Sequence, residues 1–140
     1  MSLNGLKQYQ ATSTQTGVVE ASPHRLIQML FEGALEKLAK AKGFMVRKEI
    51  EKKGQHISWA IKIIGGLQSS LDMKVGGELS VNLDKLYEYM THKLFEANVE
   101  NSIEKLDEVT HLLSNIKDGW DGIEEEVKRM KVPEARAAAV

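Results

Sequence analysis

Histidine and carboxylate side chains are the residues of this sequence whose types and spacing could support chemistry. Glu108 and His111 form a Glu-x-x-His pair, the spacing that places a carboxylate and an imidazole on one helix face in di-iron bundles. Such a site needs a second Glu-x-x-His pair and two further inward glutamates, whereas Glu88 and His92 are four residues apart. We therefore interpret these side chains as solvated surface residues and expect no metal site.

The sequence offers no other arrangement for catalysis or for a cofactor. It contains no cysteine, which excludes disulfides, thiolate nucleophiles and cysteine metal ligands. No glycine-rich phosphate loop follows a strand, and the serines and carboxylates form no nucleophile and base pair. We expect no catalytic residue and no cofactor, so the sequence indicates a binding protein rather than an enzyme.

Composition narrows the possible partners. The 140 residues carry a formal net charge of −1, which gives no electrostatic reason to expect nucleic acid or an anionic membrane as partner. The N-terminus has no apolar signal region, and no apolar run reaches the roughly 18 residues that a membrane helix needs. We expect one soluble, intracellular domain with no membrane insertion.

Two helices are predicted in the first half of the chain. Ser22 and Pro23 suit a helix start, because serine caps the free N–H groups and proline is favoured at the first helical position. Apolar residues then recur on one face to about Lys42, and Gly43 is expected to end the helix. The second helix is expected over Arg47–Leu71.

Two more helices are predicted in the second half. Asp72–Gly77 is expected to be a loop into a central helix, Gly76–Asn98. Asn101 and Glu104 form a capping pair at the start of a fourth helix, and Pro133 should end it. The central helix carries six apolar residues at three- and four-residue steps, which predict one buried side: Leu79, Leu83, Leu86, Met90, Leu94 and Ala97.

Long helices and short connections predict an all-α fold, an antiparallel up-down four-helix bundle. We expect the bundle over residues 22–131, a short and partly ordered N-terminal segment over 1–21, and a disordered tail over 132–140. Leu3, Leu6 and Tyr9 are the large apolar residues at the start of that segment. They favour either a flexible leader or a lid that docks onto the bundle.

The second predicted helix has an unusual outer side. Trp59 lies about 200° around the helix from Ile57, and Ile63, Gly66 and Ser70 follow it. An outer apolar side would be an exposed patch, and such patches mark partner sites. The alternatives are ordinary half-exposed residues or contact with a second copy of the chain. The candidate partner-binding residues, including flanks of the central helix, are Trp59, Ile63, Gly66, Leu67, Ser70, Val81, Tyr89 and Phe95.

Several motifs resemble the FliS family of flagellar secretion chaperones. They span about residues 9–120 in the family's order: Tyr9, Ala21-Ser22-Pro23, the run from Leu26 to Leu35, the run from Gly76 to Met90, Glu96-Ala97-Asn98, and Glu108-Val109 to Trp120. Position 31 is Phe where the family often has Tyr, and residues 121–140 lie outside the resemblance.

The resemblance implies a cytoplasmic helical bundle that binds the disordered C-terminal region of flagellin. It implies that the chaperone prevents premature polymerisation and assists delivery to the type III export apparatus, so that an export gate component would be a further partner. It also implies that the N-terminal segment, with Tyr9, folds over part of the binding surface in the free protein. We expect a monomer or weak homodimer. The alternatives are a ferritin-like metal-binding bundle and a structural homo-oligomer.

Overall fold

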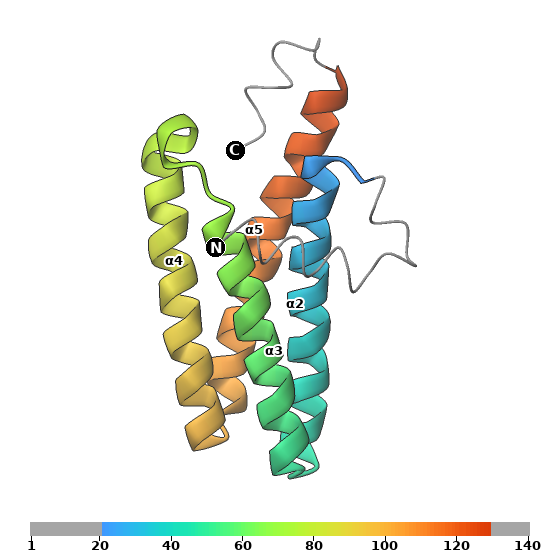
Figure 1. Cartoon of the computed structure of the whole chain (residues 1–140). Coiled ribbons are helices and arrows are strands. Elements are labelled where there is room, and N and C mark those ends of the chain that lie inside the picture. The colour runs from blue at the N-terminus through green and yellow to red at the C-terminus, as the bar shows by residue number, and fades with distance from the viewer. Residues whose placement is uncertain (1–20, 130–140) are drawn as a thin grey trace.

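The computed structural model describes residues 21–129, with side chains through residue 123. This part of the chain forms four helices and no strand: α2 (Pro23–Val46), α3 (Ile50–Ser69), α4 (Met73–Glu100) and α5 (Ile103–Arg129). The helices form a ring, because α2 and α4 each pack against both α3 and α5. Consecutive helices are joined at alternate ends and run in opposite directions (Figure 1). The predicted up-down four-helix bundle is confirmed.

Several sequence predictions fall on the ends of the chain. The proposed lid residues Leu3, Leu6 and Tyr9, the helix end at Pro133 and the tail over 132–140 all lie outside the described residues.

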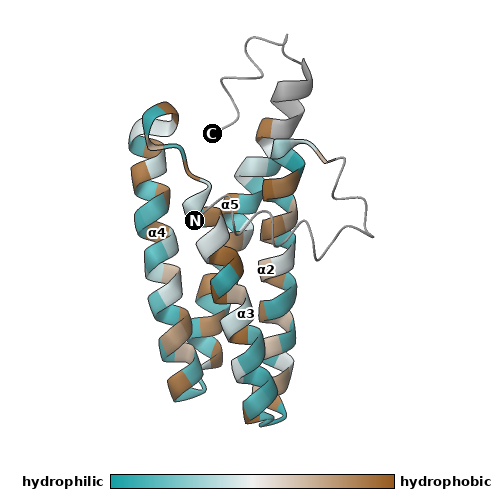
Figure 2. Ribbon diagram, in the orientation of Figure 1, coloured by the Kyte–Doolittle hydropathy of each residue, from teal (hydrophilic) through white to brown (hydrophobic). Residues whose placement is uncertain are grey.

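The core fills the centre of the ring with side chains from all four helices. Phe31 and Leu38 of α2, Ile64 of α3, Met90 of α4 and Leu113 of α5 are all buried. Fully burying a side chain of this size contributes about 1.5–3 kcal/mol. Figure 2 shows the middle of α3 as apolar and its first turns as mostly hydrophilic.

The predicted orientation of α3 is wrong at several residues. Ile63, placed with Trp59 on the outer side, is only 6% exposed, and Leu67 and Gly66 are also buried. Ile50, although apolar, is 60% exposed. A helix in a closed ring packs against two neighbours, so its buried sector is wider than the single face that periodicity predicts. Ile50 is the first residue of α3, at the end of the bundle.

Two predicted helix boundaries are also wrong. Helix α2 continues through Gly43 to Val46, because Met45 is buried and holds the last turn against the core. Asn101 caps the end of α4 in the left-handed conformation, with φ 52°, a role that asparagine tolerates. Helix α5 is capped instead by Ser102, whose Oγ accepts a hydrogen bond from the Lys105 N–H at 3.2 Å.

The start of α4 differs from the predicted loop. Met73–Gly76 forms a helical turn, and Gly77, with φ 54° and ψ −128°, separates this turn from the rest of α4. The Asp72 carboxylate caps the turn by accepting hydrogen bonds from the backbone N–H groups of Lys74 and Val75. Leu79, which was predicted to be buried, is 57% exposed.

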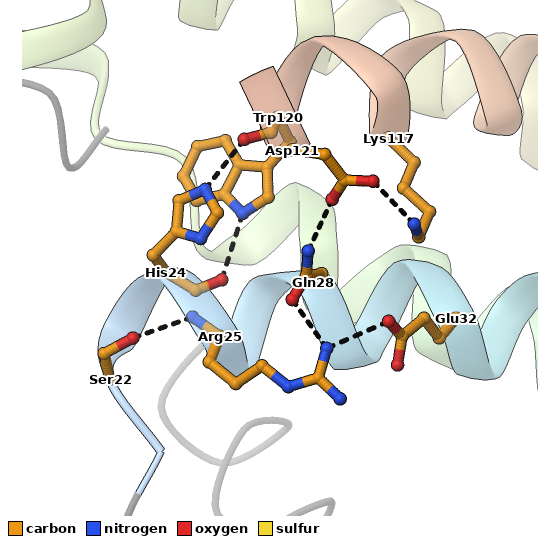
Figure 3. A network of polar contacts seen from close by, with 8 residues as sticks. All are labelled: Ser22, His24, Arg25, Gln28, Glu32, Lys117, Trp120 and Asp121. Atoms are coloured by element: carbon orange, nitrogen blue, oxygen red, sulfur yellow. Dashed lines mark hydrogen bonds and ion pairs between the residues drawn. The ribbon is translucent and has the colours of Figure 1, made fainter. Parts of the chain in front are cut away.

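A polar network joins the start of α2 to the second half of α5 (Figure 3). The rings of His24 and Trp120 stack with centroids 4.5 Å apart. His24 Nε2 donates to the Trp120 carbonyl at 2.7 Å, and Trp120 Nε1 donates to the His24 carbonyl at 3.0 Å. The Asp121 carboxylate accepts from Gln28 Nε2 at 2.6 Å and pairs with Lys117 Nζ at 2.7 Å. This network closes the ring at the end of the bundle where α2 begins.

Candidate partner-binding surface

The eight predicted partner-binding residues divide into two groups. Ile63, Gly66 and Leu67 are buried between helices, and the half-buried Ser70 donates its hydroxyl to the Leu67 carbonyl at 2.7 Å. The other four are exposed large apolar residues, and we call them the outer apolar band: Trp59, Val81, Tyr89 and Phe95.

Trp59 lies on the side of α3 that faces α2. Its side chain is 47% exposed, and Lys37 Nζ of α2 lies 3.8 Å from its ring centroid. The Lys37 side chain is itself only 14% exposed, so the cation–π attraction acts with partial desolvation and contributes about 0.5–2 kcal/mol. The ring of His56 lies 6.2 Å from that of Trp59, and Phe44 of α2 lies 4.9 Å from His56. These contacts fix the indole while leaving half of it open to a partner.

An open depression of about 500 Å³ adjoins Trp59 on the outer side of α3. It is lined by Gly54, Gln55, Ser58 and Lys62 together with Trp59. Two of these residues, Gly54 and Ser58, have small side chains that leave space above the helix backbone. A partner's apolar side chain could therefore rest on the helix backbone beside the indole.

Val81 and Phe95 lie on the outer side of α4. Val81, Glu88 and Phe95 recur every seven residues, about two helical turns, so they share one line along the helix. This line runs close to α3, because Gln68 Nε2 of α3 donates both to Glu88 Oε2 at 3.1 Å and to Asp84 Oδ1 at 2.9 Å. Phe95 is 55% exposed and Val81 is 42% exposed.

Tyr89 lies on the opposite flank of α4, towards α5. Its hydroxyl donates to the Glu108 carboxylate of α5, and this hydrogen bond raises the pKa of the phenol. Lys93 Nζ lies 5.5 Å from its ring centroid. Lys105 of α5 pairs with Glu96 of α4 at 2.7 Å on the same flank, so a partner that covers Tyr89 also meets a charged rim.

The band therefore does not form one compact patch. Its residues lie on successive outer sides of the bundle, from the α2–α3 side at Trp59, across α4 at Phe95, to the α4–α5 side at Tyr89. A single short helix covers one side of a bundle, whereas a segment that passes around the bundle can reach all of them. The geometry is that of an extended surface with apolar anchor points and polar side chains between them.

Residues that the sequence prediction missed lie mainly on α3. Ser58, Gln55 and Lys62 were not predicted, although they line the depression. The glycines of α3 are a sequence signal for a surface that needs small residues, because Gly54 and Gly65 each lower helix stability by about 1 kcal/mol relative to alanine. A Cβ added at Gly54 would lie 3.8 Å from Asn98 Oδ1, while one added at Gly65 would meet nothing within 4 Å. Packing within the described residues therefore does not require Gly65.

The predicted surface position of Glu108 and His111 agrees with the structure, since both are exposed. Glu108 accepts the Tyr89 hydrogen bond, and among the described residues no cluster of His, Cys, Asp or Glu could hold a metal ion. Over the same residues, none of the helices is both long and apolar enough to span a membrane.

Comparison with known proteins identifies clear relatives. A family model described as "Flagellar protein FliS" matches residues 5–127. The chain is 54% identical over 121 residues to the flagellar secretion chaperone FliSB of Pseudomonas aeruginosa, covering 86% of this chain and 96% of that one. It is 43% identical over 121 residues to the flagellar secretion chaperone FliS of Salmonella typhimurium, covering 86% and 90%. The FliS of Bacillus subtilis is 30% identical over 106 residues, covering 76% and 78%.

Proposed function

The chain belongs to the FliS family of flagellar secretion chaperones, and from this premise we propose that it binds the C-terminal region of flagellin in the cytoplasm. In this role it prevents premature polymerisation of flagellin and assists its delivery to the type III export apparatus. The members of this family are chaperones, not enzymes, so the prediction of a binding protein is confirmed.

The observation that carries the proposal is the outer apolar band. Its four members are each between 42% and 55% exposed, although they lie on helices whose inner sides are fully buried. Large apolar groups left exposed in this way mark partner sites. Aromatic side chains make up three of the four, and aromatic residues are the commonest anchors at protein interfaces.

The spread of the band supports an extended partner that becomes ordered on binding. A disordered segment can wrap a large surface, and it loses part of the interaction energy to the cost of its own ordering. Amphipathic helices lying in apolar grooves are one such mode. The open position at Gly65 favours close approach of a partner backbone between Trp59 and the α4 members of the band.

We further propose how the rest of the chain takes part. Residues 1–21 act as a lid over the band in the free protein, residues 22–131 form the binding domain, and an export gate component is a second partner. The protein acts as a monomer or weak homodimer, because the apolar groups of the band are committed to flagellin.

The test is a set of alanine variants titrated with a peptide of the flagellin C-terminal region. Trp59→Ala and Phe95→Ala should each weaken binding by about tenfold, which corresponds to about 1.4 kcal/mol and is less than full burial of such a side chain contributes. Val46→Ala is the matched control, because Val46 is 63% exposed at the end of α2 and lies outside the band. Equal affinities for all three variants and the original protein would contradict the proposed site.

A further inference from the structure

Three exposed apolar side chains lie at the end of the bundle that holds the α2–α3 and α4–α5 connections (Figure 1). Val46 ends α2, Ile50 begins α3, and Val99 is the second-last residue of α4. Their side chains are 63%, 60% and 86% exposed, and we call the three residues the apolar end patch. None of them belongs to the outer apolar band, so the proposed flagellin site does not account for their exposure.

A contact between α3 and α4 brings two members of the patch to adjoining helix ends. The buried Lys53 of α3 donates from Nζ to the Asn98 carbonyl of α4 at 2.9 Å. Ile50 lies one turn before Lys53, on the same side of α3, and Val99 directly follows Asn98. The patch therefore crosses the boundary between α3 and α4.

The charges around the patch are divided between the two connections. Residues 42–53, which join α2 to α3, carry five cations and two anions, a formal charge of +3. Residues 95–107, which join α4 to α5, carry one cation and four anions, a formal charge of −3. Although the whole chain has a net charge of only −1, this end of the bundle has a basic half and an acidic half.

Each half has an exposed charge that forms no ion pair with another described residue. Lys48 lies between α2 and α3, and Glu104 lies in the first turn of α5. Nearby charges are paired, since Arg47 binds Glu49 at 2.7 Å and Lys105 binds Glu100 at 3.0 Å. The ammonium of Lys48 and the carboxylate of Glu104 are therefore available to opposite charges on a partner.

A second copy of the chain matches both halves at once. The acidic half would repel an anionic partner, and the basic half would repel a cationic one. In a two-fold symmetric contact the same surface lies on both subunits, so the basic half of each copy can face the acidic half of the other. We propose that two copies of the chain associate through this end, with their apolar end patches in contact and Lys48 of each copy close to Glu104 of the other.

The size of the patch predicts how strong this contact is. An apolar centre with a polar rim is the usual arrangement of a protein interface, but three apolar side chains from each copy make a small one. Small interfaces are weak and transient, so the dimer forms reversibly. The contact does not depend on flagellin binding, because the end patch and the band share no residue.

Sedimentation equilibrium of the full-length protein without flagellin tests the proposal, from about 1 µM to about 1 mM, the range of weak association. Lys48→Glu and Glu104→Lys should each weaken dimerisation by about tenfold, because each change places like charges opposite one another twice in the symmetric contact. An equimolar mixture of the two variants, with one labelled, should form a heterodimer as tight as the original dimer, since opposite charges meet again at both positions. Lys85→Glu is the matched control, because Lys85 is exposed near the middle of α4.

The apolar centre is tested by Val99→Ser, which should weaken dimerisation several-fold because less apolar surface is removed from water. Val75→Ser is its control, since Val75 is 58% exposed in the first turn of α4, at the opposite end of the bundle (Figure 1). Circular dichroism checks that both variants remain folded.

Three outcomes would overturn the proposal. A monomer mass at every concentration would leave the end patch to a protein other than this chain. A mixture of Lys48→Glu and Glu104→Lys that associates no better than either variant alone would mean that the two halves do not meet. Dimerisation that Val75→Ser weakens and Val99→Ser does not would place the contact at the other end of the bundle.

Discussion

Replacing Ile63 with aspartate should unfold the bundle, whereas the same change at Trp59 should leave it folded. Ile63 is 6% exposed within the core, and its burial contributes about 1.5–3 kcal/mol. The new carboxylate would have to be buried without a partner, at a cost of several further kcal/mol. A domain of this size has about 5–15 kcal/mol of total stability, so most or all of it would be lost.

Trp59 provides the matched comparison because it lies one turn before Ile63 on the same helix. Its side chain is 47% exposed, so Trp59→Asp removes only part of a burial contribution. The new carboxylate would remain in contact with water and close to Lys37, whose ammonium now lies over the indole. We expect a loss of about 1–2 kcal/mol from the missing cation–π contact and partial burial.

Urea unfolding of both variants, followed by circular dichroism at 222 nm, measures this difference. Isothermal titration with the flagellin peptide then shows whether a folded variant binds. Ile63→Asp should lack a cooperative transition, while Trp59→Asp should keep one and lose affinity. A normal unfolding transition for Ile63→Asp together with lost binding would refute the placement of Ile63 in the core.

Three further predictions follow from other parts of the structure. At Asp121, burial raises the pKa of the carboxyl, but hydrogen bonds from Lys117 and Gln28 outweigh it and lower the pKa below 3.8. The stability that this carboxylate contributes is therefore complete above about pH 5 and is lost as the pH falls through the lowered pKa. Urea unfolding midpoints measured from pH 6 to pH 2 should fall less steeply with decreasing pH in Asp121→Asn than in the original protein. Gly65→Ala should raise the unfolding free energy by about 0.5–1 kcal/mol, since the new Cβ would meet nothing within 4 Å. Gly77→Ala should lower the unfolding free energy, because Gly77 has a positive φ. Denaturant unfolding of both variants distinguishes helix propensity from backbone strain. Deleting residues 1–17 should leave the melting transition in place and should strengthen, or leave unchanged, binding of the flagellin peptide. Tyr9→Ala should act in the same direction but less. Weaker binding by both stable variants would mean that the segment contacts the partner instead of acting as a lid.

The sequence was sufficient to predict the helices and their arrangement, because these depend on local signals. Ser22 accepts the predicted cap hydrogen bond from the Arg25 N–H at 3.1 Å, and Pro23 is the first residue of α2. Met90, Leu94 and Ala97 are fully buried as their spacing predicts. Short connections then leave an antiparallel bundle as the simplest arrangement.

The candidate surface was only partly predictable, because exposure depends on which neighbours cover each helix. Periodicity places Trp59 and Ile63 together on one side of α3, yet packing within the bundle buries Ile63 and leaves Trp59 half-exposed. The sequence likewise predicts that Leu79 is buried, although the helices around α4 do not cover it. The contact between Lys37 and Trp59 joins two helices, and no spacing within one helix indicates it.

Isothermal titration of the full-length protein with monomeric flagellin, and with flagellin that lacks its C-terminal region, tests the proposed function most directly. We expect saturable binding to intact flagellin and none to the truncated form. The combined variant Trp59→Ala and Phe95→Ala, checked for folding by circular dichroism, should lose most of the affinity. Equal binding to both forms of flagellin, or full affinity in the folded double variant, would contradict the proposed function and its site.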